Sequence, residues 1–266
     1  MSNKTHIANR IWEIIYPVCM YYVAITIGVF VAQLMFGAKN ETYMLCKIIG
    51  SLVALPVVWS DYKRDLIMTG RYGTKEKISK STLIEFIFVI GITVFISISL
   101  NNIISMSPLV ENSVGYENAS NAFYSSTITL ELLGSALITP ILEELLHRGV
   151  VYGRLRRMMG LLPSVLWSSF IFAILHFNIV QFTYAFLLGI VFALFVERTG
   201  KLLAAVVAHV VANTIAVVRT ETGWLSGTVD GSVSAWLISG GLLLVGIGMF
   251  IIFIGKIIHT KKDVTK

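Results

Sequence analysis

The sequence predicts an all-α protein, a polytopic bundle of membrane-spanning helices, from its composition and from the spacing of its apolar segments. Of the 266 residues, 56% are hydrophobic and 14% are charged, and the mean hydropathy is +0.79. An average soluble domain is nearer to a quarter charged. Long apolar runs alternate with short polar segments, and about 20 apolar residues suffice to cross a bilayer. We therefore expect residues 1–266 to form a single integral membrane domain.

The apolar runs predict about eight transmembrane helices. Their expected ranges are 12–36, 43–60, 82–106, 124–151, 162–180, 181–197, 202–218 and 233–255. The second segment is the least regular, because it contains both Lys47 and Pro56. Each remaining polar stretch is too short to form a soluble domain of its own.

The distribution of basic residues predicts the orientation in the membrane. With eight spans, the two termini and the loops 61–81, 152–161 and 198–201 lie on one side, and together they hold 17 of the 21 Lys and Arg residues. Cytoplasmic loops carry such an excess, so both termini are expected in the cytoplasm. The net charge of +6 is therefore attributed to topology and the lipid bilayer, and no nucleic-acid partner is expected.

Ionisable residues interrupt the fourth apolar segment, in the stretch Pro140–Arg148. Glu143, Glu144 and Arg148 lie here in otherwise apolar sequence. Facing lipid, the three charges would cost roughly 8–10 kcal/mol on the insertion scale. We therefore expect them to face the protein interior or a water-filled cavity.

Helix geometry separates the roles of the two glutamates. Glu144 and Arg148 are four positions apart, with the acid first, which is the favourable order for an ion pair on one helix face. Glu143 is rotated by about 100° from Glu144 and is free to face another group. Glu144 and Arg148 are thus interpreted as structural and Glu143 as the working carboxylate. The alternative is that all these charges only hold helices together.

Two later apolar segments contain further polar side chains. His176 lies deep in the fifth segment, while His209 and Asn213 share a helix face in the seventh. Taken singly, each could serve as a hydrogen bond between helices. Three polar-bearing helices in one membrane domain favour a functional site instead.

Several catalytic motifs are missing from the sequence. There is no His-Glu-x-x-His zinc helix, no Gly-x-Ser-x-Gly elbow, no intramembrane aspartate pair and no phosphate-binding glycine loop. Glu144 and His147 match half of a di-iron carboxylate motif, but that design requires a second copy and none occurs. His147 is interpreted as a neighbour of the charged cluster.

The three patterns Glu-Glu-x-x-x-Arg, Phe-x-x-x-His and His-x-x-x-Asn, in this order on successive membrane segments, resemble the CPBP family. These are the CAAX protease and bacteriocin-processing intramembrane endopeptidases, also called Abi proteins. The matching residues are Glu143, Glu144, Arg148, Phe172, His176, His209 and Asn213. The resemblance implies a helical membrane bundle whose catalytic core lies within residues 124–218.

The resemblance also implies roles for the residues of the site. Glu143 and His176 would activate a water molecule, and His209 and Asn213 would stabilise the oxyanion. These side chains suit such roles, because a partly desolvated carboxylate is a good general base and an amide is a neutral oxyanion donor. No cofactor is certain. If zinc is bound, its expected ligands are Glu143, His176 and His209, although Asn213 is a poor zinc ligand.

The function predicted from the sequence is hydrolysis of a peptide bond in a membrane-associated peptide or protein. A CAAX-type prenylated tail, a peptide pheromone or a bacteriocin leader would each suit the family. The alternatives are a non-catalytic membrane protein for bacteriocin immunity or partner binding, and a transporter, which would show repeated interrupted helices. The short loops favour a bacterial plasma membrane as the location.

Overall fold

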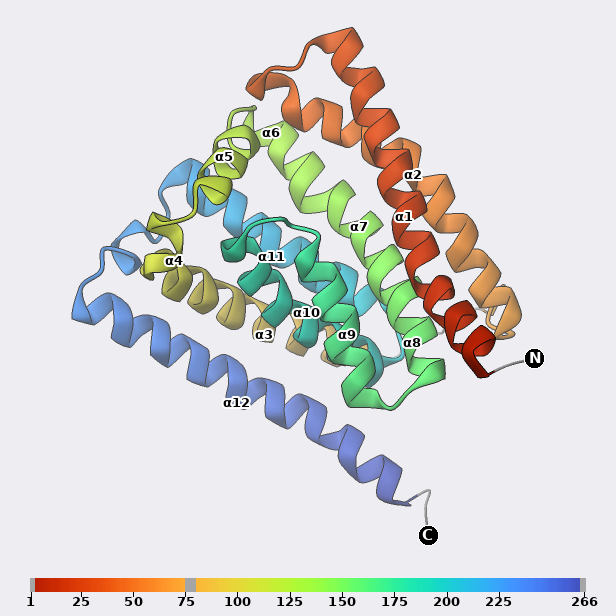
Figure 1. Ribbon diagram of the computed structural model, residues 1–266. Helices are drawn as coiled ribbons and strands as arrows, with labels where there is room; N and C mark the ends of the chain where they lie inside the picture. Colours follow the sequence, from red (N-terminus) through yellow and green to blue (C-terminus); the bar gives the residue numbers. More distant parts are fainter. Residues whose placement is uncertain (1–2, 75–79, 264–266) are drawn as a thin grey trace.

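The computed structural model describes residues 3–74 and 80–263, and in these ranges the secondary structure is entirely helical (Figure 1). The helices are α1 (Asn3–Phe36), α2 (Asn40–Met68), α3 (Lys80–Ser105), α4 (Pro108–Glu111), α5 (Val114–Phe123), α6 (Ile128–Glu131), η1 (Leu132–Ile138), α7 (Thr139–Glu144), η2 (Leu145–Tyr152), α8 (Gly153–Met158), α9 (Leu161–Ile174), α10 (Ile179–Thr199), α11 (Leu202–Thr222), η3 (Ser226–Thr228) and α12 (Val233–Asp263). The predicted all-α class is confirmed.

Six of these helices are long and apolar enough to cross a membrane, namely α1, α2, α3, α10, α11 and α12. A seventh span is formed if α5 is joined to the continuous helix from α6 to α8, from which it is bent by 111°. The fifth predicted span, 162–180, corresponds to α9, which has 14 residues and is not among these seven. At 1.5 Å per residue it reaches about 21 Å, less than the thickness of the hydrocarbon core.

Helices α1 and α2 form a tightly packed antiparallel pair on one side of the molecule (Figure 1). Their backbones meet at Gly28 and Gly50, where a Cβ on Gly28 would lie 2.7 Å from the Cα of Gly50. Small residues permit such close approach between membrane helices. Pro17 and Pro56 lie inside the two helices without ending them.

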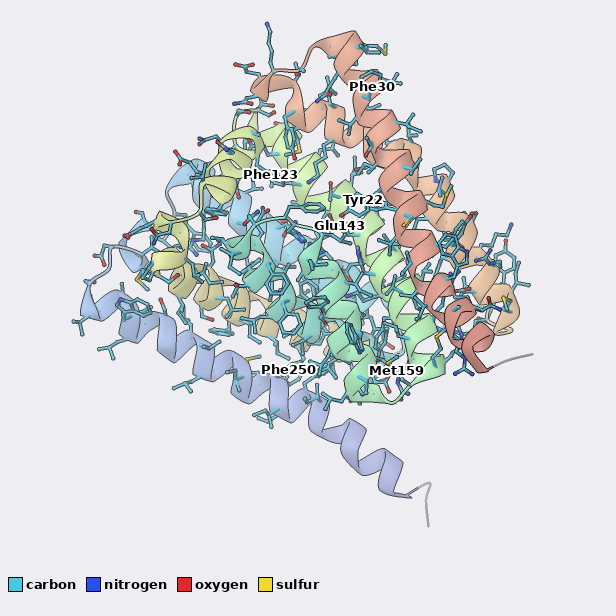
Figure 2. The ribbon with its side chains drawn as sticks, in the orientation of Figure 1. Tyr22, Phe30, Phe123, Glu143, Met159 and Phe250 are labelled. Atoms are coloured by element: carbon cyan, nitrogen blue, oxygen red, sulfur yellow. The ribbon has the colours of Figure 1, made fainter. Side chains whose placement is uncertain are left out.

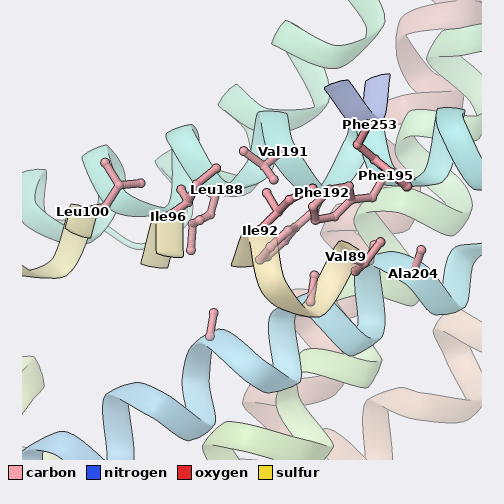
Figure 3. Close-up of a cluster of buried hydrophobic side chains, with 13 residues drawn as sticks. Val89, Ile92, Ile96, Leu100, Leu188, Val191, Phe192, Phe195, Ala204 and Phe253 are labelled. Atoms are coloured by element: carbon pink, nitrogen blue, oxygen red, sulfur yellow. The ribbon is translucent and has the colours of Figure 1, made fainter. Parts of the chain in front are cut away.

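The opposite side of the bundle contains α3, α10, α11 and α12, which share the largest apolar cluster (Figure 3). Aromatic and branched side chains from α3 and α10, such as Ile92, Phe192 and Phe195, fill this cluster. They pack against a row of alanines on α11, at positions 204, 205, 208 and 212. Small residues here again allow the helices to approach closely.

The helix from α6 to α8 runs through the centre of the bundle, between these two groups (Figure 1). It carries two π-helical segments, η1 and η2, on either side of α7. π-Helical turns widen the helix and are frequent at functional sites. The stretch Pro140–Arg148 therefore lies in the middle of the molecule, with irregular backbone before and after it.

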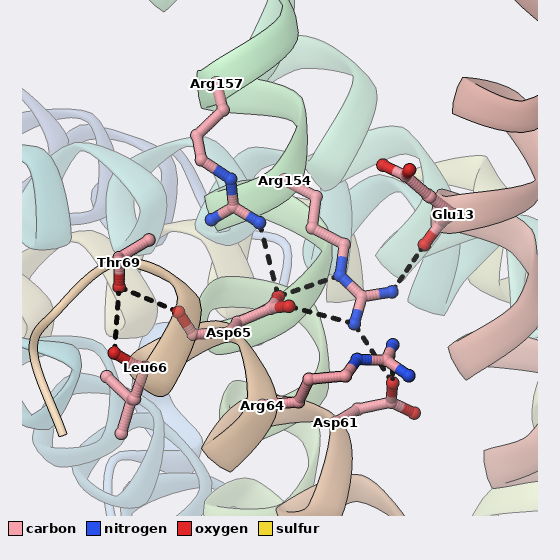
Figure 4. Close-up of polar contacts among 8 residues, drawn as sticks. All are labelled: Glu13, Asp61, Arg64, Asp65, Leu66, Thr69, Arg154 and Arg157. Carbon is pink, nitrogen blue, oxygen red and sulfur yellow. Dashed lines mark hydrogen bonds and ion pairs between the residues drawn. The ribbon is translucent and has the colours of Figure 1, made fainter. Parts of the chain in front are cut away.

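Several predicted boundaries are wrong because helices continue into the polar segments. The predicted fourth span, 124–151, corresponds to the continuous helix from α6 to α8, which begins at Ile128 and ends at Met158. Arg154 is therefore helical rather than part of a loop 152–161. Arg154 is buried because its guanidinium bonds Asp61 and Asp65 on α2 (Figure 4). These ion pairs stabilise the helical extension of α2 to Met68 as well.

Two other predicted segments also differ from the structure. The segment 107–123, expected as a loop, contains the short helices α4 and α5. The fifth span, expected over 162–180, ends at Ile174. Phe177 then adopts a positive φ of 57°, which breaks the helix before Asn178 caps α10.

Candidate active site

A cavity of about 470 Å³ lies inside the bundle, and Glu143 and His147 of the central helix line it. Its wall includes all four of the predicted catalytic side chains, which come from α7, α11 and the segment after α9. These are Glu143, His176, His209 and Asn213. Figure 2 shows Glu143 near the centre of the molecule, close to Tyr22 of α1, which lines the same cavity.

Glu144 and Arg148 form the ion pair that their spacing predicts. Arg148 Nη1 donates to Glu144 Oε1 over 3.0 Å, and both side chains are fully buried. Arg148 Nη2 also donates to the carbonyl oxygen of Gly189 on α10, over 3.1 Å. A Cβ on Gly189 would lie 3.1 Å from this nitrogen and 3.0 Å from Ser169 Cβ, so the absence of a side chain makes room for the guanidinium.

His209 connects the structural pair to Glu143. Its Nδ1 lies 2.8 Å from Glu144 Oε1, the oxygen that also accepts from Arg148. Its Nε2 lies 3.8 Å from Glu143 Oε2. Because a carboxylate oxygen accepts hydrogen bonds, the short contact assigns a hydrogen to Nδ1. Glu144 therefore orients the imidazole so that Nε2 points toward the working carboxylate.

Asn213 is held by a carbonyl that the π-helix leaves without a partner. Its Nδ2 donates to the carbonyl oxygen of Ser135 over 2.8 Å. In η1 the N–H of Thr139 bonds the carbonyl of Gly134 instead, and the next residue, Pro140, has no N–H. An amide nitrogen carries two hydrogens, so one remains for the cavity.

His176 lies just beyond the end of α9, where backbone carbonyls lose their helical partners. Its Nδ1 is 3.0 Å from the carbonyl oxygen of Phe172, which accepts the hydrogen. Asn178 Nδ2 donates to the carbonyl of His176, and Tyr22 from α1 donates to that of Leu175. The break in the helix is thus fixed on both sides, with His176 facing the cavity.

The ring of Phe172 lies at the centre of the cluster. Its centroid is 5.0 Å from that of His147, 5.1 Å from that of His176 and 5.8 Å from that of His209. The guanidinium of Arg148 lies 4.5 Å above it, a cation–π distance. Phe172 therefore packs against three imidazoles and a guanidinium at once.

His147 also lines the cavity, a position that the sequence did not indicate. Its Nδ1 lies 2.8 Å from the carbonyl oxygen of Glu143, one turn earlier. Its Nε2 is buried, and among the residues that the structure describes it has no hydrogen-bond partner. In all three histidines, a hydrogen on Nδ1 is therefore committed to a protein acceptor. In the neutral ring, Nε2 is left with the lone pair.

The arrangement does not fit the conditional zinc set. Within residues 3–74 and 80–263, no three His, Cys, Asp or Glu side chains are grouped so that they could hold a metal ion. His209 uses Nδ1 for Glu144, and its Nε2 is 3.8 Å from Glu143 Oε2. We therefore derive no step through a metal.

Some residues that shape the site had no signal in the sequence. Gly189 and Ser135 contribute backbone carbonyls, so their side chains give no indication of their role. Tyr22 is one of many aromatic residues in apolar segments. Lys47 was visible as a charge inside a predicted span, and it also lines the cavity.

Fold and site together define an integral membrane protein with carboxylate, imidazole and amide groups gathered around one interior cavity. Residues 125–215 match the model of a protein family, described as "Type II CAAX prenyl endopeptidase Rce1-like". The family resemblance that the three motifs indicated is thereby confirmed.

One curated relative supports the same assignment. The chain is 29% identical over 117 residues to a protein of Bacillus subtilis (strain 168) named "Putative membrane peptidase YdiL". The alignment covers 44% of this chain and 48% of that protein, so the chain matches about half of the relative's length. No solved structure matches the chain.

Proposed function

We propose that the protein is an intramembrane endopeptidase that hydrolyses a peptide bond of a membrane-associated peptide or protein. The observation that carries the proposal is the position of Glu143, whose Oε2 lies 3.8 Å from His209 Nε2 at the wall of the cavity. His176 and Asn213 line the same space. The matched family is described as a CAAX prenyl endopeptidase and the relative's name contains the words membrane peptidase, which supports this class of reaction.

In the proposed reaction, Glu143 is the general base. It takes one proton from a water molecule, while the lone pair on His176 Nε2 accepts the water's second hydrogen and orients it. The water oxygen attacks the scissile carbonyl carbon, and the carbonyl oxygen becomes an oxyanion. When the tetrahedral intermediate collapses, the carbon–nitrogen bond breaks and the leaving amine takes the proton from Glu143. General acid–base catalysis of this kind contributes about 10²–10⁴-fold in rate.

His209 and Asn213 would stabilise the oxyanion. Asn213 offers its second amide hydrogen, since the first is donated to Ser135. His209 can donate from Nε2 only as an imidazolium, because the hydrogen on Nδ1 faces Glu144. A positive charge on His209 would balance Glu143 and Glu144 together with Arg148. The orientation that Glu144 imposes on the imidazole points Nε2 toward Glu143, and the balance of charges supports the protonated ring that the donor role requires.

The experiment that tests the proposal compares purified wild type with Glu143→Gln and Glu143→Ala in cleavage of a panel of membrane-associated peptides. We expect both variants to remain folded, because Glu143 has no structural ion pair comparable to that of Glu144, and to lose cleavage by about 10²–10⁴-fold. Thermal unfolding in detergent checks the folded state. Full activity in Glu143→Ala would overturn the proposal.

The same variants test the non-catalytic alternative and the role of metal. The buried network of Glu144, Arg148 and His209 would also suit a membrane immunity or partner-binding protein. That function predicts that Glu143→Gln and His176→Ala still protect or bind. Elemental analysis of wild type beside Glu143→Ala addresses zinc: a stoichiometric metal, lost in the variant together with activity, would contradict metal-free activation of water.

A further inference from the structure

Lys47 places a positive charge at the wall of the cavity that holds the proposed catalytic groups. It projects from α2 and lines the same space as Glu143. Of the described residues along this wall, Lys47 is the single Lys or Arg and Glu143 the single carboxylic acid. A charge inside a membrane segment is costly, and such residues usually mark a ligand path or a charge partner.

No protein carboxylate neutralises Lys47 in the part of the chain that the structure describes, where its side chain is in no ion pair. Its ammonium nitrogen lies 4.5 Å from the centroid of the Phe123 ring, at the end of α5. A ring face holds an ammonium in place but leaves its charge available. Asp61 and Asp65, further along α2, are paired with Arg154 instead.

We infer that Lys47 binds a carboxylate of the substrate peptide and thereby selects which peptide bond lies beside the catalytic groups. The inference rests on the proposed peptidase function. Its chemistry is a charge-assisted hydrogen bond from an ammonium to a carboxylate, which is stronger than a neutral hydrogen bond. Either the free carboxyl terminus of the peptide or an acidic side chain could supply this group.

The position of Lys47 along the bundle sets the spacing between the bound carboxylate and the cleaved peptide bond. On α2, Met44 and Ile48 pack against Gly134, where a Cβ would lie 2.6 Å from Met44 Sδ and 2.9 Å from Ile48 Cγ1. Glu143 follows Gly134 by nine positions, so the two levels of the central helix are at most about 13 Å apart at the α-helical rise of 1.5 Å per residue, and less through the π turns of η1. An extended peptide covers this in about four residues, at 3.3–3.6 Å each. The bound carboxylate should therefore lie within about four residues of the cleaved bond.

The test uses the full chain and three matched fluorogenic peptides. One ends in a free carboxylate within four residues of the cleavable bond, the second ends in an amide, and the third has the amide and an internal glutamate. We expect wild type to prefer the free acid over the amide. Lys47→Met should raise KM for the free acid by about 10- to 100-fold, the range of a hydrogen bond to a charged group. Its preference for acid over amide should disappear.

The matched control is Lys39→Met, because Lys39 precedes the same helix and is exposed outside the cavity. It should retain the preference, and Lys47→Arg should retain most of it. Recovery of binding by the internal glutamate would identify a side-chain carboxylate as the natural group. A wild type that treats acid and amide alike, or a Lys47→Met variant that keeps the preference, would overturn the inference.

Failure of the proposed function remains distinguishable from failure of the inference. Affinities for the acid and amide peptides can be measured by fluorescence anisotropy with Glu143→Gln, alone and combined with Lys47→Met. If no peptide is cleaved but Lys47→Met still abolishes the preference for binding the acid over the amide, then Lys47 binds a carboxylate in a non-catalytic protein. Cleavage that depends on Glu143 without any acid preference leaves the peptidase standing and removes the role of Lys47.

Discussion

At the scale of single residues, Pro140 and Asn213 are coupled through one carbonyl group. The π-helical turn and the proline together leave the Ser135 carbonyl without a backbone donor, and Asn213 supplies one from α11. The same amide is the proposed oxyanion donor. Its structural and its chemical contribution can be separated, because they depend on different hydrogens of the amide.

We expect Asn213→Ala to lose both contributions. An unsatisfied buried carbonyl costs about 1–3 kcal/mol of stability, and removal of an oxyanion donor costs about 10²–10³-fold in rate. Pro140→Ala in the same chain restores a backbone N–H at the position that faces the Ser135 carbonyl. The double variant should regain thermal stability in detergent but not activity. If stability and activity recover together, Asn213 is a structural residue only.

The site residues themselves could be named from the sequence, because charged and strongly polar groups inside apolar segments have few physical explanations. Glu143, His176, His209 and Asn213 do line one cavity, although their catalytic roles stay a prediction. Their partners could not be named. Gly189 and Ser135 act through carbonyls, and the bond between His209 and Glu144 joins residues 65 positions apart.

At the scale of helices, the approach of α1 and α2 depends on glycines that face each other. A Cβ on Gly50 would lie 2.9 Å from the carbonyl oxygen of Ile25 and 2.6 Å from Val29 Cγ2. A backbone oxygen within a helix cannot move without its helix. Close packing is a main source of association between membrane helices, since lipid removes the hydrophobic driving force.

Gly50→Ala should therefore separate the two helices and destabilise the protein by about 1–3 kcal/mol, the usual range for overpacking. Gly241→Ala is the matched control, because a Cβ at Gly241 on α12 meets open space. In a helix interior, alanine is favoured over glycine by about 0.5–1 kcal/mol, so the control should be neutral or slightly stabilising. Thermal unfolding of both variants in the same detergent measures the difference, and equal melting temperatures would contradict the packing argument.

The long apolar helices were predictable, whereas the helix ends and the short helices α4 and α5 were not, for a physical reason. Hydropathy locates the segments that lipid requires to be apolar, but polar residues can extend a helix when they find partners across the bundle. Arg154 extends the central helix in this way through Asp61 and Asp65. The early end of α9 at Ile174 depends on the positive φ of Phe177 and on the cap that Asn178 provides. Neither the extension of the central helix nor the early end of α9 is indicated by a periodic pattern in the sequence.

At the scale of the whole molecule, the arrangement of the helices is consistent with the orientation that the basic residues predict. The loop before α9 and the turn between α10 and α11 should lie on the same membrane side as the segment after α2, and α4 should lie opposite. Six helices, or seven with the bent pair of α5 and the central helix, are long and apolar enough to cross. The predicted eight spans would also require the short α9 to cross, so this count stays a prediction. The side on which the termini lie stays a prediction.

Single-cysteine labelling measures this topology. The background is a chain in which both native cysteines are replaced, the exposed Cys19 and the buried Cys46. Cysteines placed at Thr74 and Gly160 should react with an impermeant maleimide only in inverted vesicles, while Asn112 should react in intact cells. The break at Phe177 lies about 21 Å along α9 but about 32 Å along the 21 residues of α10, so its depth is decided by experiment. If α9 sets the depth, a cysteine at position 177 should resist the reagent from both sides of a bilayer, yet react in detergent, because the residue is 82% exposed in the structure. Labelling of Phe177 in intact cells at the rate of Asn112 would show instead that α9 crosses completely.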